Sequence, residues 1–103
     1  MPYIPLEQKA NLKPGTIKPC DVQGRKVLLV CGEGGTYLVD NRCPHAGFPL
    51  EGGRVMGNRL RCPNHNYIFD LETGACARGV REGFGPLQKF ELAEDADTVG
   101  IVV

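Results

Sequence analysis

Two short runs that each combine a cysteine with a histidine constrain this chain more than any other feature. The first is Cys43-Pro44-His45 and the second is Cys62-Pro63-Asn64-His65, and residues 46–61 separate them. The chain has 2 histidines, and both fall within these runs. Thiolate and imidazole ligands from two loops can bind one metal group only if the fold brings the loops to one place. The runs therefore predict a metal centre held between two loops.

The pattern Cys-x-His followed by Cys-x-x-His resembles that of the Rieske family, in which two histidines replace two of the four cysteine ligands of a two-iron, two-sulfide cluster. Within this family the chain is most similar to the small soluble Rieske-type ferredoxins that carry electrons to oxygenases. The resemblance implies that Cys43 and Cys62 bind the inner iron, while His45 and His65 bind the outer iron through a ring nitrogen. It extends from about residue 12 to residue 103, although only the two ligand motifs are highly specific.

The resemblance also implies a reduction potential at the low end of the Rieske range. Two neutral imidazoles in place of two thiolates oppose an incoming electron less strongly, which raises the potential of the whole class. In its high-potential members two further cysteines form a disulfide between the ligand loops, and Phe48 and Asn64 stand in their places here. A Ser and a Tyr that donate hydrogen bonds to the cluster correspond to Tyr67 and Phe69. Because Phe69 has no hydroxyl to donate, we expect a potential of about −150 mV.

A zinc site is the main alternative for these donors. Zinc fingers use two cysteines and two histidines, but they usually place the cysteines together and the histidines together. The present chain interleaves them. Chance proximity of buried cysteines and ordinary histidines is a further alternative, although no histidine of the chain lies outside the motifs. The pattern favours an iron–sulfur cluster over both.

Length and composition predict one small domain, residues 1–103, with no room for a separate catalytic domain. The formal net charge is +0, and no basic stretch alternates with aromatic residues, so nothing indicates nucleic-acid binding. The first residues lack a cationic start and an apolar segment, and the longest aliphatic run, residues 27–30, is too short to cross a bilayer. We expect a soluble, cytoplasmic, monomeric protein.

Three cysteines remain once the ligands are set aside, namely Cys20, Cys31 and Cys76. An odd number of remaining cysteines without a secretion signal indicates reduced thiols, which are more often small buried hydrophobic groups than reactive ones. A redox-active pair among them stays open, because the sequence gives no distances between them.

Frequent Gly and Pro, short apolar runs and the lack of helical periodicity predict an all-β fold of antiparallel sheets. Turns are expected at residues 23–24, 33–35, 57–58 and 72–74. The expected strands are residues 3–6, 16–22, 26–30, 36–40, 54–56, 59–61, 67–71, 75–78, 88–92 and 99–103. The segment Gly83-Phe84-Gly85-Pro86 matches the proline loop that covers the cluster beside the two ligand loops in Rieske domains.

Charge is uneven along the chain. Residues 41–81 contain six arginines and three acidic residues, whereas residues 82–103 contain one lysine and five acidic residues. An ordinary solvated surface is the simpler interpretation. The alternative is that a charged face near an exposed cofactor steers a redox partner.

The resemblance to Rieske-type ferredoxins implies a one-electron carrier that passes electrons from a flavin-containing reductase to a terminal oxygenase or similar enzyme, with no substrate chemistry of its own. The small Rieske-like subunit of an NADH-dependent nitrite reductase is the alternative, although many such subunits lack the ligands. A zinc-stabilised interaction module is a third hypothesis. The side chains expected to shield the cluster from water are Pro44, Phe48, Pro49, Pro63, Tyr67, Phe84 and Pro86.

Overall fold

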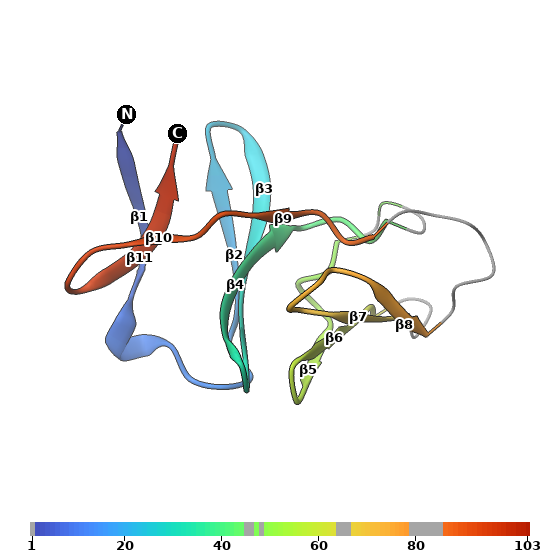
Figure 1. Ribbon diagram of the computed structural model, residues 1–103. Coiled ribbons are helices and arrows are strands. Elements are labelled where there is room, and N and C mark those ends of the chain that lie inside the picture. The colour runs from blue at the N-terminus through green and yellow to red at the C-terminus, as the bar shows by residue number, and fades with distance from the viewer. Residues whose placement is uncertain (1, 45–46, 48, 64–66, 79–85) are drawn as a thin grey trace.

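The computed structural model describes residues 2–44, 47, 49–63, 67–78 and 86–103. They form three antiparallel sheets, which confirms the all-β prediction (Figure 1). Sheet A contains β1 (Tyr3–Gln8), β11 (Thr98–Val102) and β10 (Ala93–Glu94) in this order. Sheet B contains β2 (Ile17–Val22), β3 (Arg25–Gly32), β4 (Gly35–Asp40) and β9 (Lys89–Phe90). Sheet C contains β5 (Arg54–Met56), β6 (Arg59–Arg61), β7 (Ile68–Asp70) and β8 (Cys76–Arg78).

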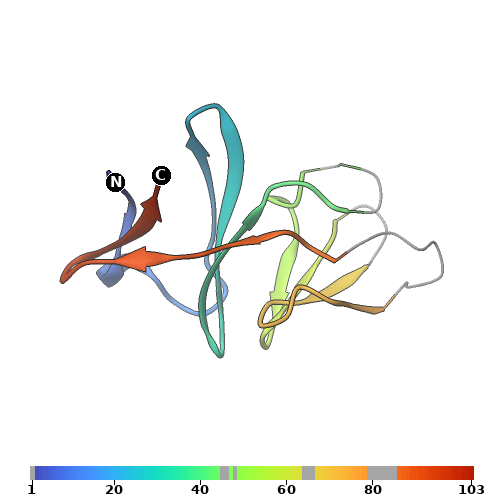
Figure 2. The ribbon, with the colours of Figure 1, turned by 45° about the horizontal axis from the view of Figure 1, so that its top comes forward.

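Sheet B lies between the other two sheets, and the sequence of β3 explains why (Figures 1 and 2). Successive side chains of a strand point to opposite faces. Leu28 and Val30 pack into one core cluster, and Val27 and Leu29 pack into another. A strand that is buried on both faces has apolar residues at successive positions, and residues 27–30 are all apolar.

The two core clusters lie on opposite faces of sheet B. The first core joins sheet B to sheet C and contains Leu28, Val30, Val39, Cys43, Leu50, Leu60, Cys62, Tyr67, Phe69, Leu71 and Leu87. The second core joins sheet B to sheet A and contains Val22, Val27, Leu29, Leu38 and Val99. Because the first core includes both motif cysteines, the sheet B–sheet C contact positions the predicted metal centre.

The predicted hairpin turns are confirmed. Gln23 and Gly24 have φ values of 52° and 83°, as a two-residue turn with two left-handed positions requires. Gly57 has a φ of 61° in the turn between β5 and β6, where Met56 pairs with Arg59.

The prediction was wrong in part near the C-terminus. The expected strand 88–92 is reduced to β9, because the chain leaves β4 after Phe90 and crosses to sheet A. There Ala93 and Glu94 pair with β11 and form β10, a strand that we did not expect. The short 3-10 helix η1 (Lys9–Asn11) was also not expected. Among the described residues, no helix is long and apolar enough to span a membrane.

A chain of hydrogen bonds through Asn58 fastens sheet C to sheet B. The Asn58 Oδ1 accepts a hydrogen bond from the Gly34 N–H at 3.0 Å, and its Nδ2 donates to the Tyr37 hydroxyl at 3.0 Å. Tyr37 in turn donates to Glu72 Oε2 at 2.7 Å, a bond that raises the pKa of Tyr37. On the backbone, the Glu33 N–H donates to the Gly57 carbonyl and the Leu71 N–H donates to the Asn58 carbonyl. The β5–β6 turn is therefore held by both neighbouring turns.

Replacing this side chain tests how much the junction contributes to stability. Asn58→Ala removes both side-chain hydrogen bonds, so we expect the free energy of unfolding to fall by about 1–3 kcal/mol. The matched control is Asn11→Ala, which removes an exposed hydrogen bond from the Asn11 Nδ2 to Glu7 Oε1. Its free energy of unfolding should change by no more than about 0.5 kcal/mol. Denaturant unfolding of the three proteins at one pH is the measurement. Equal stability of both variants would contradict the proposed fastening.

Candidate metal centre

The first motif cysteine follows β4 and is held in place by its own loop. Cys43 is 1% exposed, and its carbonyl accepts a hydrogen bond from the Gly47 N–H at 2.7 Å. The base of the loop is closed by Asn41, whose Oδ1 accepts a hydrogen bond from the Leu50 N–H at 2.8 Å. Asn41 is itself only 7% exposed. The loop thus begins and ends on buried, hydrogen-bonded residues, which fixes where Cys43 can lie.

The second motif cysteine directly follows β6. Cys62 is 0% exposed, and its N–H donates to the Tyr67 carbonyl at 2.7 Å. This bond closes the segment between the two residues as the chain turns back into β7. The strand pairing of Leu60 with Phe69 continues the same closure on sheet C. Both cysteines therefore sit at the ends of short, anchored loops.

The structure brings Cys43 and Cys62 into the same core, together with Tyr67 and Phe69. The predicted ligands His45 and His65 lie outside the described residues, as do Phe48 and Asn64. Accordingly, no group of three or more potential metal ligands occurs within the part of the chain that is described. The assignment of four ligands stays a prediction. The structure places the two predicted cysteine ligands in the same core.

The chemistry of this donor set fits an iron–sulfur cluster. Iron is bound by the thiolate form of cysteine, and a lone thiolate among apolar side chains is costly. Leu50, Leu60 and Leu87 belong to the same core as the two cysteines and are each at most 3% exposed. Positive metal ions that share the thiolate charge would remove this cost, and the apolar surroundings would keep water from the cluster.

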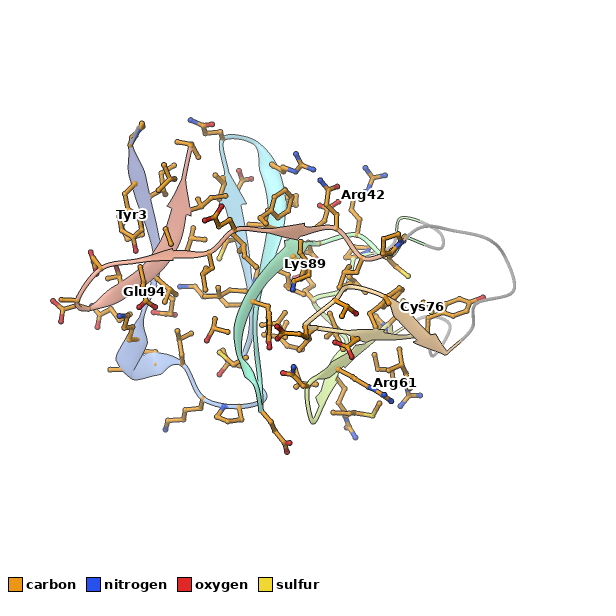
Figure 3. All side chains as sticks on the ribbon, viewed as in Figure 1. Tyr3, Arg42, Arg61, Cys76, Lys89 and Glu94 are labelled. Atoms are coloured by element: carbon orange, nitrogen blue, oxygen red, sulfur yellow. The ribbon has the colours of Figure 1, made fainter. Side chains whose placement is uncertain are left out.

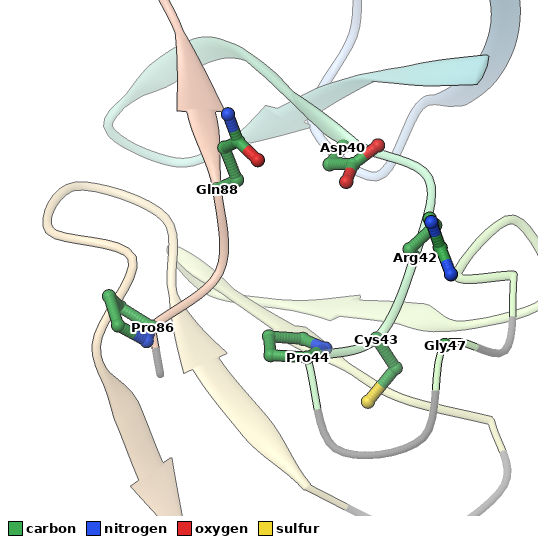
Figure 4. A pocket seen from close by; sticks show the side chains of 7 residues that line it. All are labelled: Asp40, Arg42, Cys43, Pro44, Gly47, Pro86 and Gln88. Carbon is green, nitrogen blue, oxygen red and sulfur yellow. The ribbon is translucent and has the colours of Figure 1, made fainter. Parts of the chain in front are cut away.

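A recess runs beside the first cysteine. It has a volume of about 330 Å³, and its lining includes Cys43, Pro44, Arg42 and Pro86 (Figure 4). Pro86 was expected in the proline loop, and it lies on the same recess as the first motif. The rest of that predicted loop, residues 83–85, is outside the described part of the chain.

The segment after Pro86 is anchored on the β7–β8 turn. The Leu87 N–H donates to the Gly74 carbonyl at 2.8 Å, and the Lys89 Nζ donates to the Glu72 carbonyl. Gly74 has a φ of 79°, and a Cβ on it would lie 2.6 Å from the Leu87 carbonyl oxygen. Only glycine fits such a close approach in the left-handed region. This contact leads the chain from the predicted proline loop back to sheet B.

Sequence reasoning missed Asn41 as the residue that closes the first loop. Its position two residues before Cys43 carried a weak signal, because an asparagine at the end of an apolar strand often bonds to nearby backbone. The sequence could not show that the partner would be the N–H of Leu50, nine residues away.

The remaining cysteines differ in where they lie relative to the candidate centre. Cys20 packs against the second core, and burial raises the pKa of its thiol, which disfavours the reactive thiolate. Cys76 packs against the first core on β8 (Figure 3), and Cys31 is buried with its Sγ 3.5 Å from the Thr36 Oγ1. Cys20 and Cys76 thus lie against different cores. Cys20 is thus a half-buried thiol with a raised pKa, which fits an unreactive group.

Comparisons of the sequence and of the structure with known proteins point to the same family. The Rieske [2Fe-2S] domain family matches residues 3–91. The ferredoxin component of the naphthalene 1,2-dioxygenase system of Pseudomonas putida is 31% identical over 70% of this chain and 69% of its own length. Cholesterol 7-desaturase nvd of Xenopus laevis is 41% identical over 65% of this chain. The chain spans only 15% of that enzyme, so the likeness concerns one domain of it.

Among solved structures, the ferredoxin of carbazole 1,9a-dioxygenase from Nocardioides aromaticivorans IC177 has a TM-score of 0.80 and 26% sequence identity. The match covers 95% of this chain and 94% of that ferredoxin. The family assignment agrees with the order of the sheets, with the two buried cysteines and with the range of residues that the family matches. The chain belongs to the Rieske [2Fe-2S] domain family, whose cofactor is a Rieske-type two-iron, two-sulfide cluster.

Proposed function

We propose that residues 1–103 form a single Rieske domain that works as a one-electron carrier, taking electrons from a flavin-containing reductase and delivering them to a terminal oxygenase or similar enzyme. The comparisons support this, because one dioxygenase ferredoxin matches 95% of the chain and another matches 70% of it. In this role it supplies electrons, and the partner enzyme performs the oxygenation. A cytoplasmic location and a monomeric state are part of the proposal.

The proposed ligands are Cys43, His45, Cys62 and His65. The observation that carries the proposal is that both cysteines are buried in one core, at the ends of β4 and β6 on neighbouring sheets. Each is followed by a proline and then, two or three residues from the cysteine, by a histidine. When bound, the cluster accepts and releases one electron.

The chain's own residues would hold the ligands and keep water out. Asn41 and the Cys62–Tyr67 bond fix the backbone on which the ligands stand. On the core side, water would be excluded by Leu50, Leu60 and Phe69, each 0% exposed. The histidines, which the resemblance to Rieske proteins assigns to the outer iron, are the proposed exit for the electron. Transient redox contacts are small, so a modest surface at the loop tips suffices for a partner.

The small subunit of an NADH-dependent nitrite reductase is the second candidate. Many such subunits lack the cluster ligands, whereas all four are present in this sequence. A zinc-stabilised interaction module is the third. Metal content separates the third candidate from the first two, and the genes next to the coding gene separate the first two.

The first prediction concerns composition. The purified protein should contain about two iron atoms and two acid-labile sulfides per chain, and it should show a Rieske-type electron paramagnetic resonance signal after reduction. Metal analysis, sulfide determination and spectroscopy on one preparation are the measurements. One tightly held zinc without sulfide would refute the proposed cofactor in this protein.

The second prediction concerns the ligands. If a cluster still assembles in His45→Cys or His65→Cys, its potential should fall by roughly 100 mV, because each exchange adds a thiolate charge and clusters with four cysteines lie near −400 mV. The control is Cys20→Ser, which changes a thiol against the other core and should leave the potential unchanged. An unchanged or higher potential in the histidine variants would mean that these side chains are not ligands.

The third prediction concerns Phe69, which stands where high-potential relatives place a tyrosine. Phe69→Tyr should restore a hydrogen-bond donor toward a ligand sulfur and raise the potential modestly. A hydrogen bond to a charged group contributes about 1.5–3 kcal/mol, and only its difference between the two redox states moves the potential. A difference of about 1 kcal/mol corresponds to roughly 40 mV for one electron. Protein-film voltammetry at one pH measures the shift.

The matched control for this variant is Phe90→Tyr, which adds the same hydroxyl to a phenylalanine beside the second core. It should leave the potential unchanged. A downward shift in Phe69→Tyr, or equal shifts in both variants, would mean that position 69 does not face the cluster.

A further inference from the structure

The outward face of the β5–β6 hairpin carries an unusual set of side chains. Leu60 is 0% exposed and Val55 packs against the first core, so both point inward. By the two-residue period of a strand, their neighbours Arg54, Met56, Arg59 and Arg61 take the opposite face. We call these four residues the arginine face.

Like charges oppose each other on this face. Arg54 pairs directly with Arg61 across the two strands, and Met56 pairs with Arg59. Like charges opposite each other destabilise a sheet. Within the described part of the chain, no ion pair involves Arg54 or Arg59. Arg54 and Arg59, which are both exposed, can therefore face the carboxylates of a partner.

Nearby acidic side chains only partly offset this charge. Asp70 lies opposite Arg59 across the β6–β7 ladder. Its Oδ1 accepts hydrogen bonds from the Glu72 N–H at 2.8 Å and the Thr73 N–H at 3.2 Å. These bonds hold its carboxylate at the β7–β8 turn.

The arginine face borders the second ligand loop. A recess of about 360 Å³ is lined by Gly52, Gly53, Arg54, Arg61 and Pro63. Pro63 directly follows Cys62, so an acidic group in this recess touches the loop that holds a ligand of the proposed cluster. Met56, which is 37% exposed, adds an apolar contact beside the arginines.

Acidic residues predominate at the opposite end of the molecule, although one of them, Glu94, pairs with Lys9 at 3.5 Å. The segment 91–97 contains Glu91, Glu94, Asp95 and Asp97, and β10 within it belongs to sheet A. Figure 3 shows Arg61 and Glu94 on opposite sides of sheet B, in a molecule whose longest extent is 41 Å. A neutral chain with its charges separated in this way is oriented by the field of a charged partner.

We propose that the arginine face is a docking surface for a redox partner protein that presents carboxylates around its own electron-transfer site. The proposal rests on the proposed function in naming a redox partner. The acidic end would point away from that partner, and so the second ligand loop would meet it first. The affinity and the rate of electron transfer would therefore depend on the two exposed arginines, Arg54 and Arg59, and on the ionic strength.

The test uses the cluster-loaded protein, reduced beforehand with dithionite, with oxidised cytochrome b5 as an acidic redox probe and oxidised cytochrome c as a basic one. The variant is Arg54→Gln/Arg59→Gln, which spares Arg61 next to Cys62. The matched control is Lys9→Gln/Lys13→Gln, which removes the same charge from η1 and the segment after it, where Lys9 pairs with Glu94. The electron paramagnetic resonance signal and the potential should be the same in all three proteins.

Two quantities are measured with each probe: the dissociation constant on the immobilised cytochrome and the rate of its reduction in stopped flow. With cytochrome b5 at about 10 mM ionic strength, where the Debye length is about 30 Å, the arginine variant should bind and react roughly fivefold more weakly than the wild type. At about 1 M, where the Debye length is about 3 Å, the two should agree. With cytochrome c, the variant should bind no worse than the wild type.

Several results would overturn the proposal. They are an unchanged dissociation constant in the arginine variant, an equal loss in the lysine control, and a loss that persists at about 1 M salt. Tighter binding of a single-stranded oligonucleotide than of cytochrome b5, or salt-sensitive self-association in sedimentation, would assign the face to a nucleic acid or to the acidic end of a second copy. Arginine-dependent binding without any reduction of the probe would refute the electron-carrier function and leave the docking surface intact.

Discussion

The contact between sheets B and C is the constraint on which the rest of the structure depends. Neither sheet can bury its apolar face alone, and their shared core contains Leu28 and Val30 from β3 beside Leu60 and Phe69 from sheet C. The same core includes Cys43 and Cys62. If the two sheets shifted relative to each other, the thiols would separate. The packing that stabilises the fold is thus the packing that sets the geometry of the candidate centre.

The two motif loops are fixed at their bases by different means. The first loop depends on one buried side chain, Asn41, which bonds to the Leu50 N–H. At the second loop, a backbone hydrogen bond from the Cys62 N–H to the Tyr67 carbonyl closes the segment. Ligands held by residues that are themselves locked need little rearrangement when a cluster binds or changes charge. This favours a site built on strand ends over one built on a long free loop.

Much of the fold could be predicted because local chemistry determines it. Gln23-Gly24 and Gly57-Asn58 predicted hairpins through the backbone positions that glycine permits, and the apolar run in β3 matched burial on both faces. The two cysteines could be predicted as a pair from their motifs. The strand β10 could not, because it forms only where β11 offers an edge.

The arginine face shows a second limit of sequence reasoning. The docking proposal built on it would also explain how a chain of zero net charge can discriminate between partner proteins by their charge. The excess of arginine in residues 41–81 was visible, but its concentration on one side of a hairpin depends on the register that pairs Arg54 with Arg61. A carrier must meet two partners in turn and release each, so strong apolar binding would slow its turnover. Charge raises the rate of encounter without requiring a large buried area, and the small exposed apolar contribution of Met56 suits rapid release. Separated charges on a neutral molecule therefore fit a carrier better than either a uniformly charged or a broadly apolar surface.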